Sequence, residues 1–157
     1  DVYAAVGVHS AVASGKIRTL HGAISAMQKG GTQPTRNKTA RSLPTIVFHG
    51  DCDKVVHVSN ANAFVGAFAV SAKRPIKGQL QHGRSDGGRD FTRTVYPSTA
   101  GQATCENWTV HGGGHAWFGG KRTGSHTDPA GPDASREIIR FFLAHRLQPD
   151  GRKRARL

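Results

Sequence analysis

The sequence predicts an α/β fold, in which short apolar strands alternate with helices along the chain. Residues 43–48 form a continuous apolar run, which is typical of a parallel strand buried on both faces. Apolar residues recur at helical spacing over 19–29 and over 60–73. Two loops that carry Asp and His, 51–56 and 112–120, follow predicted strands. Ligands of open α/β sheets bind at this end of the strands.

The first half of the chain contains two predicted strands and two predicted helices. Residues 2–8 are rich in strand-forming side chains and begin the series. The helix over 19–29 follows and is ended by a pair of glycines. The buried strand 43–48 comes after a polar, basic loop, and the helix over 60–73 is ended by a proline.

The second half should add a hairpin and a last helix. Residues 76–90 are rich in glycine and charge, and we expect a loop there. Residues 91–96 and 103–111 flank a turn containing proline and glycine, which predicts a β-hairpin. Asp133 is placed to cap a helix over 134–146. Its core-facing residues are expected to be Ile138, Phe141, Phe142 and Leu147.

The length fits one domain, and the composition excludes a membrane span. The chain has 157 residues, of which 36% are hydrophobic and 20 are glycine, a balance typical of globular proteins. The longest apolar run, 61–72, is interrupted by Asn62, Gly66 and Ser71 and falls short of the ~18 residues that a span requires. Because Asp1 already opens a strand-like segment, we expect a fragment of a longer protein.

The charge is strongly basic, with 22 Lys and Arg against 10 Asp and Glu. A pI near 10.7 is typical of a protein that binds nucleic acid. However, the basic residues are scattered, and no nucleic-acid-binding motif accompanies them. Residues 148–157 read as a basic, disordered tail behind a partial domain over 1–147. We therefore expect no specific nucleic-acid partner, although a non-catalytic basic binding module stays open as an alternative.

Asp53 and His115 are the candidate catalytic residues. Asp53 follows the buried strand 43–48, and His115 lies in the glycine-rich loop 112–120. A carboxylate that orients an imidazole produces a general base. In α/β-hydrolases the catalytic residues follow the order Ser, Asp, His. The chain has the last two in that order, so the serine would precede Asp53.

Ser85 matches the nucleophile pattern literally, in Gly83-Arg-Ser-Asp-Gly87, but we reject it. A nucleophile elbow needs an apolar strand before the serine and a helix after it. Residues 78–82 are polar, and residues 88–96 lead into a strand. Ser85 also lies between Asp53 and His115, which is the wrong order for this fold. We therefore expect no nucleophile in this chain.

Several motifs together resemble the polyhydroxybutyrate (PHB) depolymerase-type esterases, which are serine hydrolases of the α/β-hydrolase superfamily. The resemblance covers roughly residues 1–146. It rests on Asp1-Val-Tyr-Ala-Ala-Val-Gly-Val-His-Ser10, Pro44-Thr-Ile-Val-Phe-His-Gly-Asp-Cys-Asp53, Gly114-His-Ala-Trp117 and Gly124-Ser-His-Thr-Asp-Pro-Ala-Gly-Pro-Asp-Ala-Ser135. Cys52 departs from the pattern, because a small residue is expected there.

The resemblance implies the C-terminal half of an α/β-hydrolase, with Asp53 as the acid and His115 as the base. Trp117 would form a wall of the ester site, and His57, which follows the acid loop, could also contact substrate. The nucleophile and the oxyanion hole would lie upstream of Asp1, so the chain alone should be inactive.

The resemblance also implies a substrate class and a location. The substrate would be a short-chain hydroxyalkanoate polyester or an acyl or feruloyl ester, cleaved without a cofactor. The protein would be secreted or periplasmic.

The cysteines raise two further questions, a disulfide and a metal site. Cys52 follows one strand, whereas Cys105 lies near the opposite end of another, about 20 Å away if the strands are parallel. A disulfide needs Cα atoms within about 7 Å, so we expect no Cys52–Cys105 bridge. A metal-binding protein is an alternative to the esterase, although the spacing fits no compact zinc pattern. Its candidate ligands are His49, Asp51, Cys52, Asp53, His57, Cys105, His111 and His115.

Overall fold

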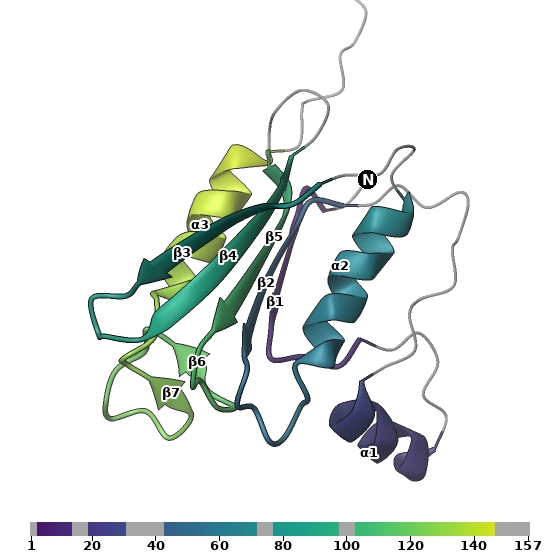
Figure 1. Ribbon diagram of the computed structural model, residues 1–157, viewed down its shortest axis with the longest axis vertical. Coiled ribbons are helices and arrows are strands. Elements are labelled where there is room, and N and C mark those ends of the chain that lie inside the picture. The colour runs from purple at the N-terminus through teal and green to yellow at the C-terminus, as the bar shows by residue number, and fades with distance from the viewer. Residues whose placement is uncertain (1–2, 14–18, 31–42, 72–76, 98–102, 147–157) are drawn as a thin grey trace, which may run out of the picture.

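The computed structural model describes residues 3–13, 19–30, 43–71, 77–97 and 103–146. Over these ranges the chain is a mixed α/β structure built on a five-stranded sheet (Figure 1). The strands, in the order in which they pair, are β1 (Val6–His9), β2 (Thr45–Gly50), β5 (Ala103–Val110), β4 (Asp90–Pro97) and β3 (Gln79–Arg84). The predicted α/β class is confirmed.

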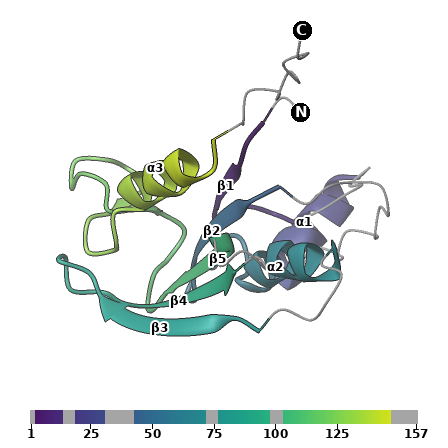
Figure 2. The ribbon, with the colours of Figure 1, turned by 90° about the horizontal axis from the view of Figure 1, so that it is seen from above.

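Helices pack on both faces of the sheet, as Figure 2 shows from above. Among the described residues they are α1 (Leu20–Lys29), α2 (Ser59–Ser71) and α3 (Ala134–Ala144). The apolar core on the α3 face contains Ile46, Phe48, Trp108, Val110, Phe118, Ala134 and Phe141. The smaller core on the α2 face contains Val8, Val47 and Ala61. Consecutive residues of β2 thus point to opposite faces, which explains its unbroken apolar run.

The register of the parallel strands brings the two candidate loops together. β1 pairs with β2 in parallel, and β2 pairs with β5 in parallel. In the second pair, Gly50 lies opposite Val110. Because these two residues end their strands, the loops that follow β2 and β5 begin side by side at one edge of the sheet.

The expectation of a loop over 76–90 is wrong, because β3 occupies Gln79–Arg84 and pairs antiparallel with β4. β3 forms the end of the sheet, and nearly all its residues are exposed. An edge strand of this kind does not need an apolar face, and polar side chains protect it from pairing with other chains. Its sequence therefore carries no apolar alternation.

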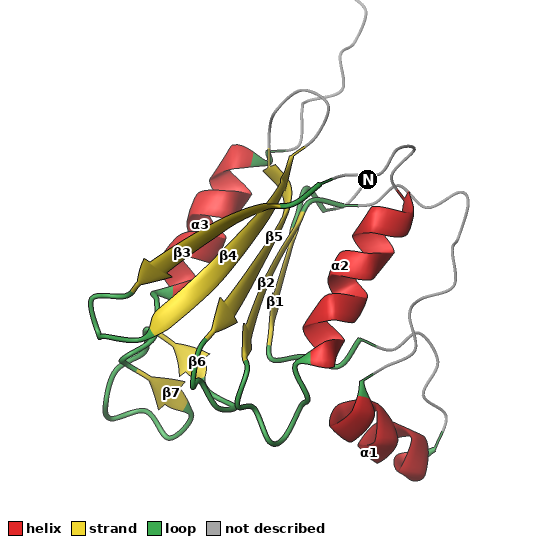
Figure 3. Cartoon of the chain, viewed as in Figure 1, coloured by secondary structure: helices red, strands yellow, loops and turns green. Residues whose placement is uncertain are grey.

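The predicted hairpin between β4 and β5 is confirmed by antiparallel pairing. With β3 added, the sheet has two parallel and two antiparallel strand pairings, so it is more mixed than the predicted parallel sheet with a single hairpin. β1 starts at Val6, four residues later than expected. Two short strands, β6 (Trp117–Phe118) inside the expected loop 112–120 and β7 (Thr127–Asp128) after it, form a separate parallel pair (Figure 3).

Helix α3 begins as the sequence predicts. The Asp133 carboxylate accepts a hydrogen bond from the amide of Arg136, at 2.9 Å, and so caps the helix. Phe141 is fully buried and Ile138 packs against the same core. Phe142, however, is 40% exposed, so its expected inward orientation is only partly correct. Leu147 and the predicted tail 148–157 lie outside the described residues.

No helix in the described part of the chain is long and apolar enough to cross a membrane.

Candidate active site

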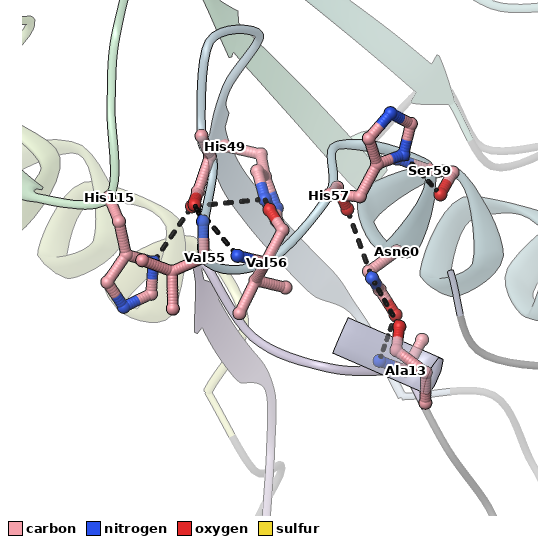
Figure 4. A network of polar contacts seen from close by, with 10 residues as sticks. Ala13, His49, Val55, Val56, His57, Ser59, Asn60 and His115 are labelled. Atoms are coloured by element: carbon pink, nitrogen blue, oxygen red, sulfur yellow. Dashed lines mark hydrogen bonds and ion pairs between the residues drawn. The ribbon is translucent and has the colours of Figure 1, made fainter. Parts of the chain in front are cut away.

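Asp53 is buried in a turn directly after β2. Its side chain is fully shielded from solvent. Oδ1 accepts hydrogen bonds from the amides of Val55 and Val56, at 2.9 and 2.8 Å. Oδ2 faces Nδ1 of His115 at 2.9 Å. Figure 4 shows Val55, Val56, His49 and His115 lying around the contacts of this turn. One carboxylate oxygen of Asp53 thus binds backbone amides of the turn, and the other contacts the imidazole of His115.

The environment of Asp53 keeps it ionised. Burial by itself would raise the pKa of this carboxyl. The hydrogen bonds from the Val56 amide, His115 and the Val55 amide, together with the charge of His115, outweigh burial and lower the pKa below its ordinary value. A buried carboxylate that stays charged can hold an adjacent imidazole in one orientation and stabilise its protonated form.

His115 presents its other ring nitrogen away from Asp53. Because the ionised carboxylate only accepts hydrogen bonds, Nδ1 carries the proton in this contact, and Nε2 of the neutral ring has a lone pair. The side chain is 34% exposed. One nitrogen is therefore fixed by a buried acid while the ring stays accessible, which is the geometry of a general base.

The loop that carries His115 lies tightly against the acid loop. The Cys52 amide donates to the Gly113 carbonyl at 3.0 Å. A Cβ atom on Gly50 would lie 2.2 Å from that same carbonyl oxygen, so only glycine allows this approach. Gly112 has a φ of 68°, a left-handed conformation that also favours glycine. Gly50 and Gly112 thus allow the two loops to approach, which brings Asp53 and His115 together.

His49 is a second imidazole beside Asp53. It is almost fully buried on β2, and Nε2 donates to the carbonyl of Val56 at 2.7 Å. The same nitrogen lies 3.4 Å from Oδ2 of Asp53. Burial lowers the pKa of His49, despite the carbonyl and Asp53. His49 is therefore a neutral donor that completes the hydrogen-bonding shell of the acid turn.

His9 is a third imidazole close to the pair, and sequence reasoning gave it no role. It ends β1, opposite Phe48. Its ring stacks on Trp117, with centroids 4.5 Å apart, and its Nε2 accepts a hydrogen bond from the Phe118 amide at 3.3 Å. Burial, followed by the nearby His49 and His115, lowers the pKa of His9 to about 4. The sequence feature that could have identified His9 is its position at the carboxyl end of a parallel strand, where ligands of α/β sheets bind.

Trp117 follows His115 by two residues and is partly exposed. It is 40% exposed, and its indole nitrogen donates to Ser135 at 3.0 Å. The stacked His9 supports the inner face of the ring. Trp117 is thus an accessible aromatic surface in the loop that carries His115, while its role as a substrate wall stays a prediction.

His57 is exposed and engaged elsewhere. Its Nδ1 lies 2.8 Å from the hydroxyl of Ser59, at the start of α2. The carbonyl of His57 accepts from the amide of Asn60, and the side-chain amide of Asn60 also donates to it. Figure 4 shows the His57 ring apart from His115. The structure therefore gives His57 a helix-start role and does not bring it to the pair.

Ser10, which directly follows His9, has an unusual backbone. Its φ is 44°, and it is the one non-glycine residue with positive φ among those the structure describes. Its Oγ is buried and makes no hydrogen bond. Strained, unsatisfied residues of this kind concentrate at functional sites. Ser10 is thus a second feature of this edge that the sequence did not reveal.

Ser85 lies in the tight turn between β3 and β4. Its hydroxyl donates to the carbonyl of Ala130 at 2.5 Å and also meets the carbonyl of Arg89. A strand does precede it, contrary to the polar loop expected there, but another strand follows where an elbow needs a helix. The turn uses Ser85 to anchor the hairpin to the loop before α3.

The cysteines and the proposed metal ligands do not assemble. Cys52 and Cys105 are not bridged to each other, as predicted, and both are free. Cys105 lies opposite Thr45 at the start of the parallel pair, whereas Cys52 follows its end. Within the described ranges, which include all eight candidate ligands, no three His, Cys, Asp or Glu side chains are grouped to hold a metal ion. The metal-site alternative therefore lacks geometric support.

Comparison of the chain with protein-family models and with curated proteins finds no match. The resemblance to PHB depolymerase-type esterases stays a prediction from motifs. The independent contribution of the structure is the contact between a buried Asp53 and an accessible His115.

Proposed function

We propose that this chain carries the acid and the base of a serine-type carboxylic ester hydrolase, in the C-terminal half of an α/β-hydrolase fold. The observation that carries the proposal is the 2.9 Å contact between Oδ2 of Asp53 and Nδ1 of His115. Both residues follow parallel strands, and they occur in the order that α/β-hydrolases use. The nucleophilic serine comes from polypeptide outside these residues.

The proposed mechanism is acyl transfer through a covalent intermediate. The serine oxygen attacks the ester carbonyl while Nε2 of His115 takes its proton. The protonated imidazole is stabilised by Asp53, and it returns the proton to the leaving alcohol as the C–O bond breaks. His115 then takes a proton from water, whose oxygen attacks the acyl-serine ester. The acid is released, and the serine recovers its proton.

The substrate class in this proposal follows from the motif resemblance. It is an ester of a short-chain hydroxyalkanoate polymer, or an acyl or feruloyl ester. The exposed indole of Trp117 supports it, because an aromatic surface beside the base can hold the apolar part of an ester. A secreted or periplasmic location would suit a polymeric substrate.

Fluorophosphonate labelling tests the proposal directly. The 157-residue chain and a version extended upstream in its reading frame would be treated in parallel, and the modified serine mapped by mass spectrometry. We expect a label only in the extended protein, on a serine flanked by glycines, and loss of that label in His115→Asn.

Two outcomes would contradict the proposal. A label on Ser10 or Ser85 in the short chain would mean that the nucleophile lies within it. The absence of any label in the extended protein, together with no ester hydrolysis, would mean that Asp53 and His115 serve no serine esterase.

A further inference from the structure

A second aspartate–histidine pair lies beside the first. Asp51 accepts two hydrogen bonds from the loop after β5: Oδ1 from the Gly112 amide at 2.7 Å, and Oδ2 from Nδ1 of His111 at 2.8 Å. Nε2 of His111 meets the Thr92 hydroxyl at 2.8 Å, and that hydroxyl meets Nδ1 of His82 at 3.1 Å. None of these contacts belongs to the Asp53–His115 pair.

The contacts have one consistent direction. The Asp51 carboxylate can only accept, so Nδ1 of His111 donates to it. Nε2 of the neutral ring then accepts from the Thr92 hydroxyl, whose oxygen accepts from His82. Thr92 lies on β4 and His82 on β3. This series of hydrogen bonds therefore connects Asp51 to β4 and β3, the two strands at the antiparallel end of the sheet.

Asp51 connects the two loops that supply the catalytic candidates. It lies two residues before Asp53 in the acid loop, and its partners His111 and Gly112 precede His115 in the other loop. The backbone joins the loops in the same place, since the Asp51 amide donates to the Val110 carbonyl at 3.1 Å.

The carboxylate of Asp51 is suited to this task. Burial would raise its pKa, but the hydrogen bonds from His111, Gly112 and Cys52 outweigh that effect and lower it. The side chains of Asp51 and His111 remain 34% and 44% exposed. They are not core residues, so truncating them removes a bridge without leaving a large cavity.

We propose that Asp51, held by His111, is a positioning residue that fixes the His115 loop against the acid loop. Its catalytic meaning rests on the proposed function, because a misplacement of about 1 Å can cost a catalytic group about a hundredfold in rate. The geometric effect does not depend on that function. Without the Asp51 bridge, the Gly112–His115 segment detaches from the acid loop more often, and Nδ1 of His115 separates from Asp53.

The test observes His115 by proton NMR in the 157-residue chain. The reporter is the downfield Nδ1 proton that His115 shares with Asp53, whose exchange with solvent is measured beside that of the Gly112 amide. In Asp51→Ala, both protons should exchange at least tenfold faster, or the Nδ1 signal should broaden beyond detection. The matched control is Asp86→Asn, an exposed aspartate in the β3–β4 turn, which should change both rates less than twofold.

Variants of His111 separate positioning from a general loss of structure. The amide nitrogen of Asn overlaps the place of Nδ1, so His111→Asn keeps the bond to Asp51 and should retain slow exchange at His115. His111→Leu removes that bond and should accelerate it. If Asp51→Ala fails to fold, Asp51→Asn and the two His111 variants supply the same comparison.

The outcomes are distinct from those of the labelling experiment. Unchanged His115 exchange in Asp51→Ala and His111→Leu, with only the Gly112 amide accelerated, would overturn the inference and leave Asp51 as a local turn residue. A failure of fluorophosphonate labelling, with His115 exchange responding as described, would overturn the esterase and leave the positioning role in place.

Discussion

At the residue scale, the Asp53 carboxylate and the neighbouring histidines differ in how burial affects their charge. Asp53 is buried yet charged, because two backbone amides and His115 compensate for lost hydration. His9, which is partly buried, and His49, which is almost fully buried, are neutral, because no ionised partner compensates fully for their lost hydration. The result is a charged acid with neutral imidazoles on its inner side and an accessible imidazole on its outer side.

Asp53→Asn should inactivate the extended protein without unfolding it. The amide oxygen can still accept from Val55 and Val56, so the turn persists, but the amide no longer fixes the Nδ1–H tautomer of His115. We expect the rate of ester hydrolysis or fluorophosphonate labelling to fall about 10⁴-fold. Asp86→Asn is the matched control and should leave the rate unchanged. A fall of less than tenfold would argue against Asp53 as the triad acid.

The partly buried His9 predicts a specific pH dependence of stability. Its pKa is about 4 in the folded chain against 6.5 ordinarily. Between pH 6.5 and 4 the unfolded chain binds a proton that the folded chain does not, so the free energy of unfolding falls as pH falls, by about 3 kcal/mol at most. His49 acts in the same direction.

Urea unfolding at several pH values between 4 and 7 measures this effect. His9→Phe keeps an aromatic ring against Trp117 but cannot be protonated, so its stability should depend less on pH in this window. His126→Phe changes an exposed histidine and should keep the wild-type slope. Equal slopes for all three proteins would mean that the fold does not hold His9 in its neutral form.

At the element scale, polar contacts join pieces that are distant in sequence. Glu106 on β5 is fully buried and accepts from Arg93 on β4, from Arg140 on α3 and from the indole of Trp108. Burial would raise its pKa, but the two arginines lower it. Glu106 therefore holds the last helix onto the antiparallel part of the sheet.

Glu106→Gln should lower the free energy of unfolding by about 3 kcal/mol, because it leaves two arginines facing a neutral group in a buried site. Glu137→Gln removes another carboxylate of Arg140, but one that is 24% exposed, and should cost less than about 1 kcal/mol. Urea unfolding at pH 7 compares them. The difference should shrink as pH falls through the lowered pKa of Glu106, where the wild-type carboxylate is itself protonated. Equal costs for the two variants would contradict this assignment.

Two glycines of the active-site loops should respond oppositely to alanine. In Gly50→Ala the new Cβ would meet the backbone of Gly113, so the two loops must separate, at a cost of about 1–3 kcal/mol. Gly114 has open space around it and should tolerate alanine within about 1 kcal/mol. Thermal unfolding and the His115 Nδ1 proton signal measure the two effects. Retention of that signal in Gly50→Ala would show that the close approach is not required.

The elements themselves were largely readable from the sequence. α1, β2, α2, the β4–β5 hairpin and α3 all have strong apolar periodicity or clear end signals, and all were predicted within a few residues. β3 was missed because Gln79–Arg84 is stabilised by pairing with β4 and not by burial of its side chains. Edge strands of this kind leave little trace in the pattern of apolar residues.

At the scale of the whole molecule, one side of the sheet presents apolar surface. The outer edge of β1 pairs with no strand among the described residues. Nearby on α3, Ile139 and Leu143 are each 57% exposed, and Phe142 packs close to Gly7 of β1. An unpaired strand beside exposed aliphatic side chains favours association between copies of a chain.

We therefore predict that this chain self-associates as its concentration rises. Sedimentation velocity over a range of concentrations should show a growing oligomer fraction for the wild type, and a smaller one for Ile139→Lys combined with Leu143→Lys. Leu80→Lys is the control, because Leu80 is 64% exposed on the opposite edge strand. The prediction would be contradicted by a wild type that stays monomeric. It would also be contradicted by a double variant that associates as strongly as the wild type.

The sequence by itself determined the α/β class, the helices, the buried strand and the two catalytic candidates. These follow from local periodicity, from glycine-rich turns and from the order of Asp53 and His115, all of which can be read from the amino-acid sequence alone. Only the tertiary structure decided that Asp53 meets His115, that His9 and His49 surround them, and that Asp51 and His111 form a second bridge. The physical reason is that the register of Gly50 against Val110 sets these contacts across about sixty residues, and no local pattern encodes the pairing of distant strands.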